Sequence, residues 1–150
     1  MSSNYIICAE RDSGKTTFVR TLIKRGMIEK GIISLSNKDK SEYYALNVET
    51  GEWKILLSKN GEGEDSIGPF KINNESFSWA NDILSTLDSG SILIDEIGRL
   101  ELSGKGFAPS LLTLLKKDVA LYITVRTPFL KEVVEYFNIE DYKVLNGSSL

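Results

Sequence analysis

The 150-residue chain contains no histidine. This absence excludes Ser-His and Cys-His triads, histidine-ligated metal sites and acid–base catalysis by an imidazole. Any catalysis must therefore use carboxylates, lysine, arginine, hydroxyl groups, main-chain amides or a bound ion. Cys8 is the only cysteine, so no internal disulfide can form, which fits a reducing compartment. It lies in an apolar run, where packing is a commoner role than nucleophilic catalysis.

Long apolar runs and basic blocks are also missing. No segment approaches the length of a membrane span, and the N-terminal apolar run is too short for a signal peptide. With a net charge of -3 and a pI of about 5.1, the chain is not expected to bind nucleic acid. We expect a cytoplasmic protein without a membrane partner, whose oligomeric state the sequence does not indicate. Hydrophobic residues make up 41% of the chain, enough for residues 1–150 to form a single domain with its own core.

The most informative pattern that is present lies near the N-terminus. A short apolar run leads into a polar loop that ends in Gly14-Lys15-Thr16, and an amphipathic helix follows, which is the P-loop arrangement. Main-chain amides of such a loop surround a β-phosphate, and the helix N-terminus adds partial positive charge. Lys15 would reach the β- and γ-phosphates, and the Thr16 hydroxyl would bind Mg²⁺. The predicted nucleotide-binding residues are Ala9, Glu10, Arg11, Asp12, Ser13, Gly14, Lys15, Thr16 and Thr17.

Strands and helices are expected to alternate along the chain. Apolar runs predict strands over residues 4–9, 31–35, 43–48, 53–57, 91–95, 119–125 and 142–145. Helical spacing of apolar residues predicts helices over residues 15–25, 77–87, 107–115 and 129–137. This order predicts an α/β P-loop NTPase fold with a mostly parallel sheet flanked by helices and an antiparallel β insertion after the first helix. Glycines and a proline between residues 58 and 69 predict a mobile loop.

Two consecutive acids, Asp95 and Glu96, end one of the buried strands. In an open α/β sheet, ligands bind at the carboxyl ends of the strands, and the P-loop also leaves its strand at that end. Asp95 and Lys15 are therefore expected to meet, although they are far apart in the sequence. Asp95 is the predicted metal ligand beside Thr16. Glu96 is the predicted catalytic base that orients or deprotonates the attacking water, and Lys15 is the second predicted catalytic residue.

Three arginines and two threonines are weaker candidates. Arg11, Arg99 and Arg126 could each neutralise charge in a transition state, although a solvated surface role is commoner for any one of them. Thr124 and Thr127 could each place a polar group near a γ-phosphate.

A family resemblance rests on two segments. These are Gly14-Lys15-Thr16-Thr17 and Asp95-Glu96-Ile97-Gly98-Arg99-Leu100-Glu101-Leu102. They resemble the THEP-type nucleoside-triphosphatases, small P-loop enzymes that slowly hydrolyse ATP, GTP and other nucleoside triphosphates. The family pattern of the second segment is Asp-Glu-Ile-Gly, a variable residue and Met-Glu-Leu, so Leu100 replaces the methionine; Ala9 replaces the first glycine of the P-loop. The segment 68–72 also resembles the family, and the likeness spans residues 5–137.

The resemblance implies a nucleoside triphosphate as substrate and Mg²⁺ as cofactor. It implies Lys15 and Thr16 at the phosphates, Asp95 at the metal and Glu96 as the base. The predicted activity is Mg²⁺-dependent hydrolysis of ATP, GTP and other nucleoside triphosphates to the diphosphate and phosphate.

Three other readings of the same motifs remain. A GTPase-like switch fits the Asp-x-x-Gly spacing of Asp95 and Gly98, but no guanine-specific Asn-Lys-x-Asp follows downstream. A small-molecule kinase would need an arginine-rich lid, whereas residues 58–69 contain no arginine and are acidic. A regulatory module that binds nucleotide with little hydrolysis is compatible with the sequence.

Overall fold

The computed structural model describes residues 3–10 and 14–146. Its strands are β1 (Ser3–Ala9), β2 (Lys30–Ser36), β3 (Glu42–Asn47), β4 (Trp53–Ser58), β5 (Ser66–Ile67), β6 (Phe70–Ile72), β7 (Ser91–Ile97), β8 (Ala120–Arg126) and β9 (Lys143–Asn146). Its helices are α1 (Lys15–Lys24), α2 (Asn74–Ser85), α3 (Arg99–Leu102), α4 (Ala108–Leu114), the 3₁₀ helix η1 (Thr127–Phe129) and α5 (Leu130–Tyr136). None of the described helices is long and apolar enough to span a bilayer.

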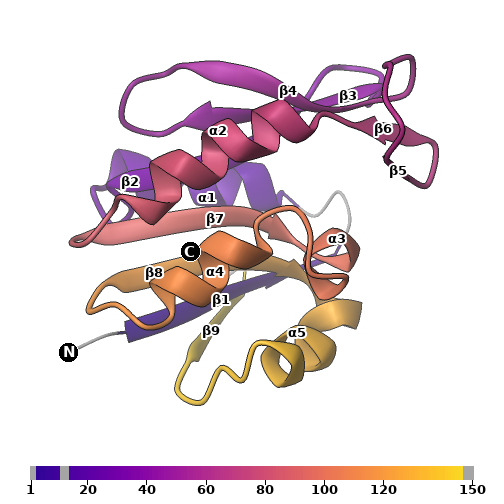
Figure 1. Cartoon of the computed structure of the whole chain (residues 1–150). Helices are drawn as coiled ribbons and strands as arrows, with labels where there is room; N and C mark the ends of the chain where they lie inside the picture. The colour runs from indigo at the N-terminus through magenta and orange to yellow at the C-terminus, as the bar shows by residue number, and fades with distance from the viewer. Residues whose placement is uncertain (1–2, 11–13, 147–150) are drawn as a thin grey trace.

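The described strands form one sheet in the order β5-β6-β4-β3-β2-β7-β8-β1-β9. Strands β2, β7, β8, β1 and β9 pair in parallel and form the core of the sheet. Strands β3, β4, β6 and β5 pair antiparallel and extend it from the side of β2. The predicted α/β architecture with an antiparallel extension after the first helix is therefore confirmed (Figure 1).

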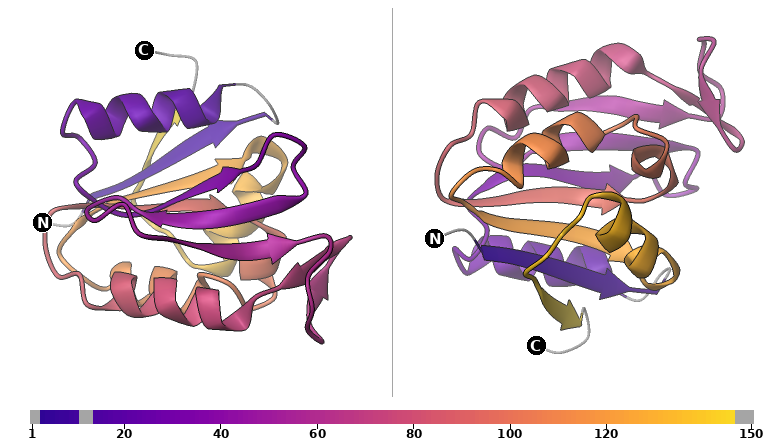
Figure 2. Two further views of the ribbon diagram at one scale, coloured as in Figure 1. Left: turned by 90° about the horizontal axis from the view of Figure 1, so that it is seen from above. Right: turned by 60° about the horizontal axis from the view of Figure 1, so that its bottom comes forward.

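Helices cover the two faces of the sheet unequally. Helix α1 lies on one face, and α2, α4 and α5 lie on the other (Figure 2). Two hydrophobic clusters follow this division, one around Phe18 and Leu22 of α1 and one around Phe77 and Leu111 of α2 and α4. Because the central strands contact helices on both faces, consecutive residues such as Ile6 and Ile7 are both buried. The central strands are therefore packed on both faces, and their carboxyl ends carry the candidate site.

The predictions on either side of the antiparallel extension fare differently. The strand expected over residues 31–35 is β2, which connects the two parts of the sheet: it pairs in parallel with β7, where Gly31 lies opposite Leu93, and antiparallel with β3. The loop expected over residues 58–69 is wrong at its C-terminal end, because β5 and β6 form a hairpin there. Gly68, which has φ 55°, and Pro69 connect the two strands, and a glycine with positive φ at the first central position suits a tight hairpin turn.

Candidate active site

Helix α1 begins directly after the glycine of the P-loop sequence. Gly14 is its N-cap and has φ 86°, a left-handed conformation that glycine adopts without the steric cost other residues incur. The Gly14 carbonyl accepts the first helical hydrogen bond from the amide of Phe18, at 3.1 Å. Lys15 is therefore the first residue of the helix, at the end of α1 that carries partial positive charge. The predicted binding residues Arg11, Asp12 and Ser13 lie outside the described residues.

The Lys15 ammonium contacts both acids at the end of β7. Its Nζ lies 2.9 Å from Oδ1 of Asp95 and also forms an ion pair with Oε1 of Glu96. The expected meeting of Lys15 and Asp95, 80 residues apart, is confirmed. Asp95 is fully buried, whereas the Glu96 side chain is 42% exposed. The site therefore contains one carboxylate that is shielded from solvent, Asp95, and one that solvent can reach, Glu96.

An irregularity near the end of β7 lets two consecutive acids reach the same ammonium. In a regular strand, neighbouring side chains point to opposite faces of the sheet. The pairing of β7 with β8 shifts register between Ile94 and Ile97, and Glu96 has φ 67°, in the left-handed region that non-glycine residues rarely occupy. This irregularity removes the alternation at the two positions where it would separate Asp95 from Glu96.

Thr124, which lies on β8, ties the two acids together. Its hydroxyl accepts a hydrogen bond from the main-chain amide of Glu96 at 2.7 Å and donates one to Oδ1 of Asp95. Thr124 is buried, so both bonds are shielded from water. The sequence had singled out Thr124 as a candidate for a polar group near a γ-phosphate; in the structure its hydroxyl bonds both members of the acid pair.

The other oxygen of Asp95 is held from the opposite side. Its Oδ2 accepts a hydrogen bond of 2.9 Å from the main-chain amide of Ser34 on β2. Asp95 is therefore fixed by three elements, namely α1, β2 and β8. No sequence signal could have identified Ser34, because a main-chain amide carries no side-chain signature. Its contribution depends only on where β2 ends beside β7.

The pKa of Lys15 is raised above its ordinary value. Burial alone would lower the pKa of this ammonium, but the negative charges of Asp95 and Glu96 and their hydrogen bonds outweigh the burial. Lys15 therefore stays protonated, as a group that attracts phosphate must be. A bound triphosphate would compete with the two carboxylates for this ammonium.

The donor set of the site fits magnesium. The described residues contain no group of three or more histidine, cysteine, aspartate or glutamate side chains that could enclose an ion. Mg²⁺ is commonly held by only one or two protein oxygens, with substrate phosphates and water completing its octahedron. The Thr16 hydroxyl at the start of α1 and the Asp95 carboxylate are oxygen donors of this kind.

The remaining candidates do not join this cluster. Arg99 is exposed at the start of α3, Arg126 is half-buried at the end of β8, and Thr127 is exposed in η1. Within the described residues, none of the three forms a hydrogen bond or ion pair with Lys15 or the acid pair.

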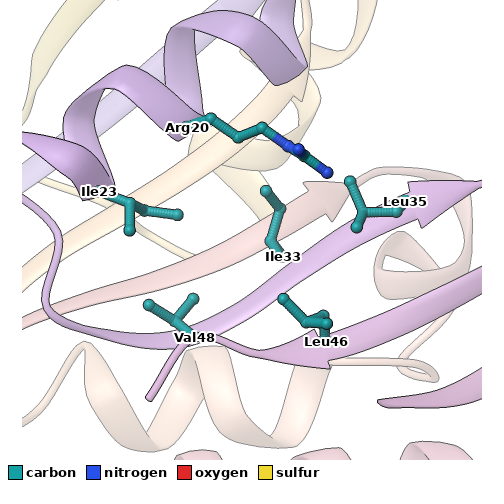
Figure 3. Close-up of a pocket in the computed structure, with 6 residues that line it drawn as sticks. All are labelled: Arg20, Ile23, Ile33, Leu35, Leu46 and Val48. Atoms are coloured by element: carbon teal, nitrogen blue, oxygen red, sulfur yellow. The ribbon is translucent and has the colours of Figure 1, made fainter. Parts of the chain in front are cut away.

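A shallow apolar groove of about 260 Å³ lies beside α1. Its walls come from α1, β2 and β3, and the Arg20 side chain extends from α1 towards Leu35 of β2 (Figure 3). The lining residues are Arg20, Ile23, Ile33, Leu35, Leu46 and Val48. Lys15, Asp95 and Glu96 are not among these lining residues.

Comparison with known sequences identifies the family. A sequence model of a family described as NTPase matches residues 4–146. The chain belongs to this family. Family membership makes it a nucleoside-triphosphatase and confirms the resemblance that the two motifs carried. No curated protein sequence matches the chain.

Solved structures confirm the fold of this NTPase family member. The crystal structure of THEP1 from the hyperthermophile Aquifex aeolicus matches with a TM-score of 0.76 and 21% sequence identity, covering 99% of this chain and 91% of that one. The solution structure of a human cancer-related nucleoside triphosphatase matches with a TM-score of 0.72 and 21% identity, covering 97% and 88%. At this identity the two likenesses show the fold alone.

Proposed function

We propose that this NTPase family member hydrolyses ATP, GTP and other nucleoside triphosphates to the diphosphate and phosphate, and that Mg²⁺ is required. The observation that carries the proposal is the position of the Lys15 ammonium at the P-loop helix, in contact with both Asp95 and Glu96. One structural neighbour is described as a nucleoside triphosphatase, which supports the same activity. The substrate is a free nucleotide, since the net charge of -3 does not favour a nucleic acid partner. We also propose a cytoplasmic location.

The phosphate chain is bound by residues 9–17. Lys15 exchanges its carboxylate partners for the β- and γ-phosphate oxygens, which gives each phosphate contact a strong charge-assisted hydrogen bond. This exchange removes Lys15 from Oδ1 of Asp95, while the Ser34 amide on Oδ2 and the Thr124 hydroxyl on Oδ1 keep that carboxylate in place. Thr16 and Asp95 would hold Mg²⁺, which would supply positive charge to neutralise the phosphates.

Glu96 is the proposed catalytic base. It is the exposed member of the acid pair, so water can reach its carboxylate, and it lies beside the ammonium that binds the γ-phosphate. A carboxylate in this position accepts the proton of the attacking water or aligns that water with the phosphorus atom. Its main-chain amide is fixed by Thr124, which limits how far the carboxylate can move.

The test is phosphate release from a panel of nucleoside triphosphates, with and without Mg²⁺, combined with two variants. Lys15→Ala should abolish nucleotide binding or turnover. Glu96→Gln should leave binding intact and lower kcat by about 10²-fold or more, the usual contribution of a general base. Lys24→Ala, a change of an exposed lysine at the other end of α1, is the control for the first variant.

Two outcomes would contradict the proposal. Unchanged turnover in Glu96→Gln would remove Glu96 as the base. Measurable binding without phosphate release from any nucleotide would instead favour a regulatory module.

A further inference from the structure

A second carboxylate, Glu101 in α3, is buried close to the acid pair and has no role in the mechanism above. It is 3% exposed, although α3 is a short helix at the surface. Its Oε1 accepts a hydrogen bond from the amide of Gly98 at 2.9 Å, and its Oε2 accepts one from the amide of Phe107 at 3.0 Å. Burying a carboxylate is costly unless its oxygens are bonded, so both bonds are needed to keep it in place.

Helix capping explains only half of this arrangement. A glutamate at the third position of a helix commonly reaches back to the amide of the N-cap residue, here Gly98. The bond to Phe107 goes further, because that residue is the N-cap of α4. Glu101 therefore joins the starts of two helices and closes the loop between them (α3 and α4 in Figure 1).

The chain passes very close to this carboxylate at Gly106. That residue has φ 61°, and a Cβ atom there would lie 2.2 Å from Oε2 of Glu101. Real atoms do not approach so closely, so a Cβ at residue 106 would have to displace the Glu101 carboxylate from its present place. The loop thus has a glycine where it passes the Glu101 carboxylate, a feature that an exposed glutamate would not require.

Glu101 acts on the same short segment that carries Glu96. The Thr124 hydroxyl holds the amide of Glu96, and Glu101 holds the amide of Gly98, two residues later. Between these two points the main chain adopts the φ of 67° at Glu96. A non-glycine residue in that conformation costs about 1–3 kcal/mol and persists only where its surroundings impose it.

We propose that Glu101 is a positioning residue, whose buried carboxylate fixes the main chain at Gly98 and Phe107 and thereby holds Glu96 in place for catalysis. This inference rests on the proposed role of Glu96. It predicts that weakening the Glu101 bonds lets the end of β7 relax towards regular strand geometry. The Glu96 carboxylate would then leave its place beside Lys15, while the phosphate-binding loop would be unaffected.

The test uses Glu101→Gln in the full chain, with Glu135→Gln on exposed α5 as the matched control. Glutamine keeps one acceptor oxygen but points an NH₂ group at a main-chain N–H, so one of the two bonds is lost. We expect kcat to fall about tenfold, as a small displacement of a catalytic group does, with KM changed by less than about twofold. In the Glu96→Gln background, the same substitution should cause no further loss of kcat.

Hydrogen exchange gives a readout that does not depend on activity. Glu101→Gln should speed exchange of the Glu96 and Gly98 amides, while the amides of α1 keep their protection. Glu101→Asp, whose shorter side chain cannot span both amides, supplies the same measurements if the glutamine variant does not fold.

Each result decides the matter. An equal loss of kcat in both backgrounds would overturn the proposal, because Glu101 would then act independently of Glu96. Unchanged kcat in Glu101→Gln, with a large loss in Glu96→Gln, would overturn it while the proposed function stands. If Glu96→Gln alone has no effect, Glu96 is not the base, and the catalytic role proposed for Glu101 is overturned together with that of Glu96.

Discussion

The buried Glu101 carboxylate should make the stability of this protein depend on pH in a defined direction. Burial raises the pKa of Glu101 from 4.5 to about 7; the amides of Phe107 and Gly98 oppose the rise, and the negative charge of Glu96 adds to it. Because the pKa is higher in the folded protein than in the unfolded chain, the folded state binds the extra proton between these two values. The free energy of unfolding therefore falls as the pH rises through this window.

The magnitude follows from the two pKa values. A difference of about 2.5 units corresponds to roughly 3.4 kcal/mol once the group is ionised in both states. Between about pH 5 and pH 8, the ionisation of Glu101 should lower the free energy of unfolding by about 2.5 kcal/mol. Little of this is screened, since the residue is almost inaccessible to solvent.

Urea unfolding of the wild type and of Glu101→Gln across this pH range measures the effect. Other titrating groups contribute equally to both proteins, so the difference between them isolates Glu101. The glutamine variant should gain stability relative to the wild type as the pH rises, by about 2.5 kcal/mol over the range. A difference that stays constant with pH would refute the reasoning, because it would mean that Glu101 titrates alike in the folded and unfolded states.

Two further predictions concern the same part of the molecule. Thr124→Val removes the hydroxyl that bridges the two acids, so kcat should fall about tenfold or more. Thr124→Ser keeps the hydroxyl, and its kcat should stay within about threefold of the wild type. A valine variant as active as the serine variant would contradict the bridging role. Gly106→Ala should lower the free energy of unfolding, measured by chemical denaturation, by at least about 2 kcal/mol. Gly104 has a similar positive φ, but a Cβ added there would approach its nearest atom only to 3.7 Å, so Gly104→Ala should lower the free energy of unfolding by only about 1 kcal/mol. Equal losses would mean that backbone strain, and not the approach to Glu101, sets the cost.

The sequence predicted the elements of the fold well where their hydrophobic patterns are long. The strands around Ile6 and Leu93 and the helix around Leu111 lie where their apolar residues placed them. The neighbours of β2 could not be predicted, because an apolar run shows that a strand is buried but not with which strand it pairs. The hairpin of β5 and β6 was missed because its strands have only two and three residues, too few for alternation to be visible. Description of residues 1–150 as one domain remains a prediction.

The candidate site was predictable in part. Lys15 and Asp95 could be paired because both follow the carboxyl ends of parallel strands, a rule of topology that needs no coordinates. Glu101 was visible only as one fixed position of the family pattern. A glutamate in a four-residue helix gives no sign in the sequence that it is buried. Its burial arises from the fold of the loop that follows α3. The roles assigned to the predicted site residues remain proposals until the variants are measured.

The geometry of the acid pair explains why supporting residues are needed at all. Asp95 and Glu96 are adjacent in the sequence, so a regular strand would direct them to opposite faces of the sheet, and only one could reach Lys15. The positive φ at Glu96 brings both to the ammonium at a cost in backbone strain. A bound Thr124 hydroxyl on one side and a buried Glu101 carboxylate on the other make the regular alternative unfavourable, since relaxation of the strand would leave buried polar groups without partners. The strained backbone at Glu96 and the buried Glu101 carboxylate therefore depend on each other. Removing either the Thr124 hydroxyl or the Glu101 carboxylate should let the main chain at Glu96 relax.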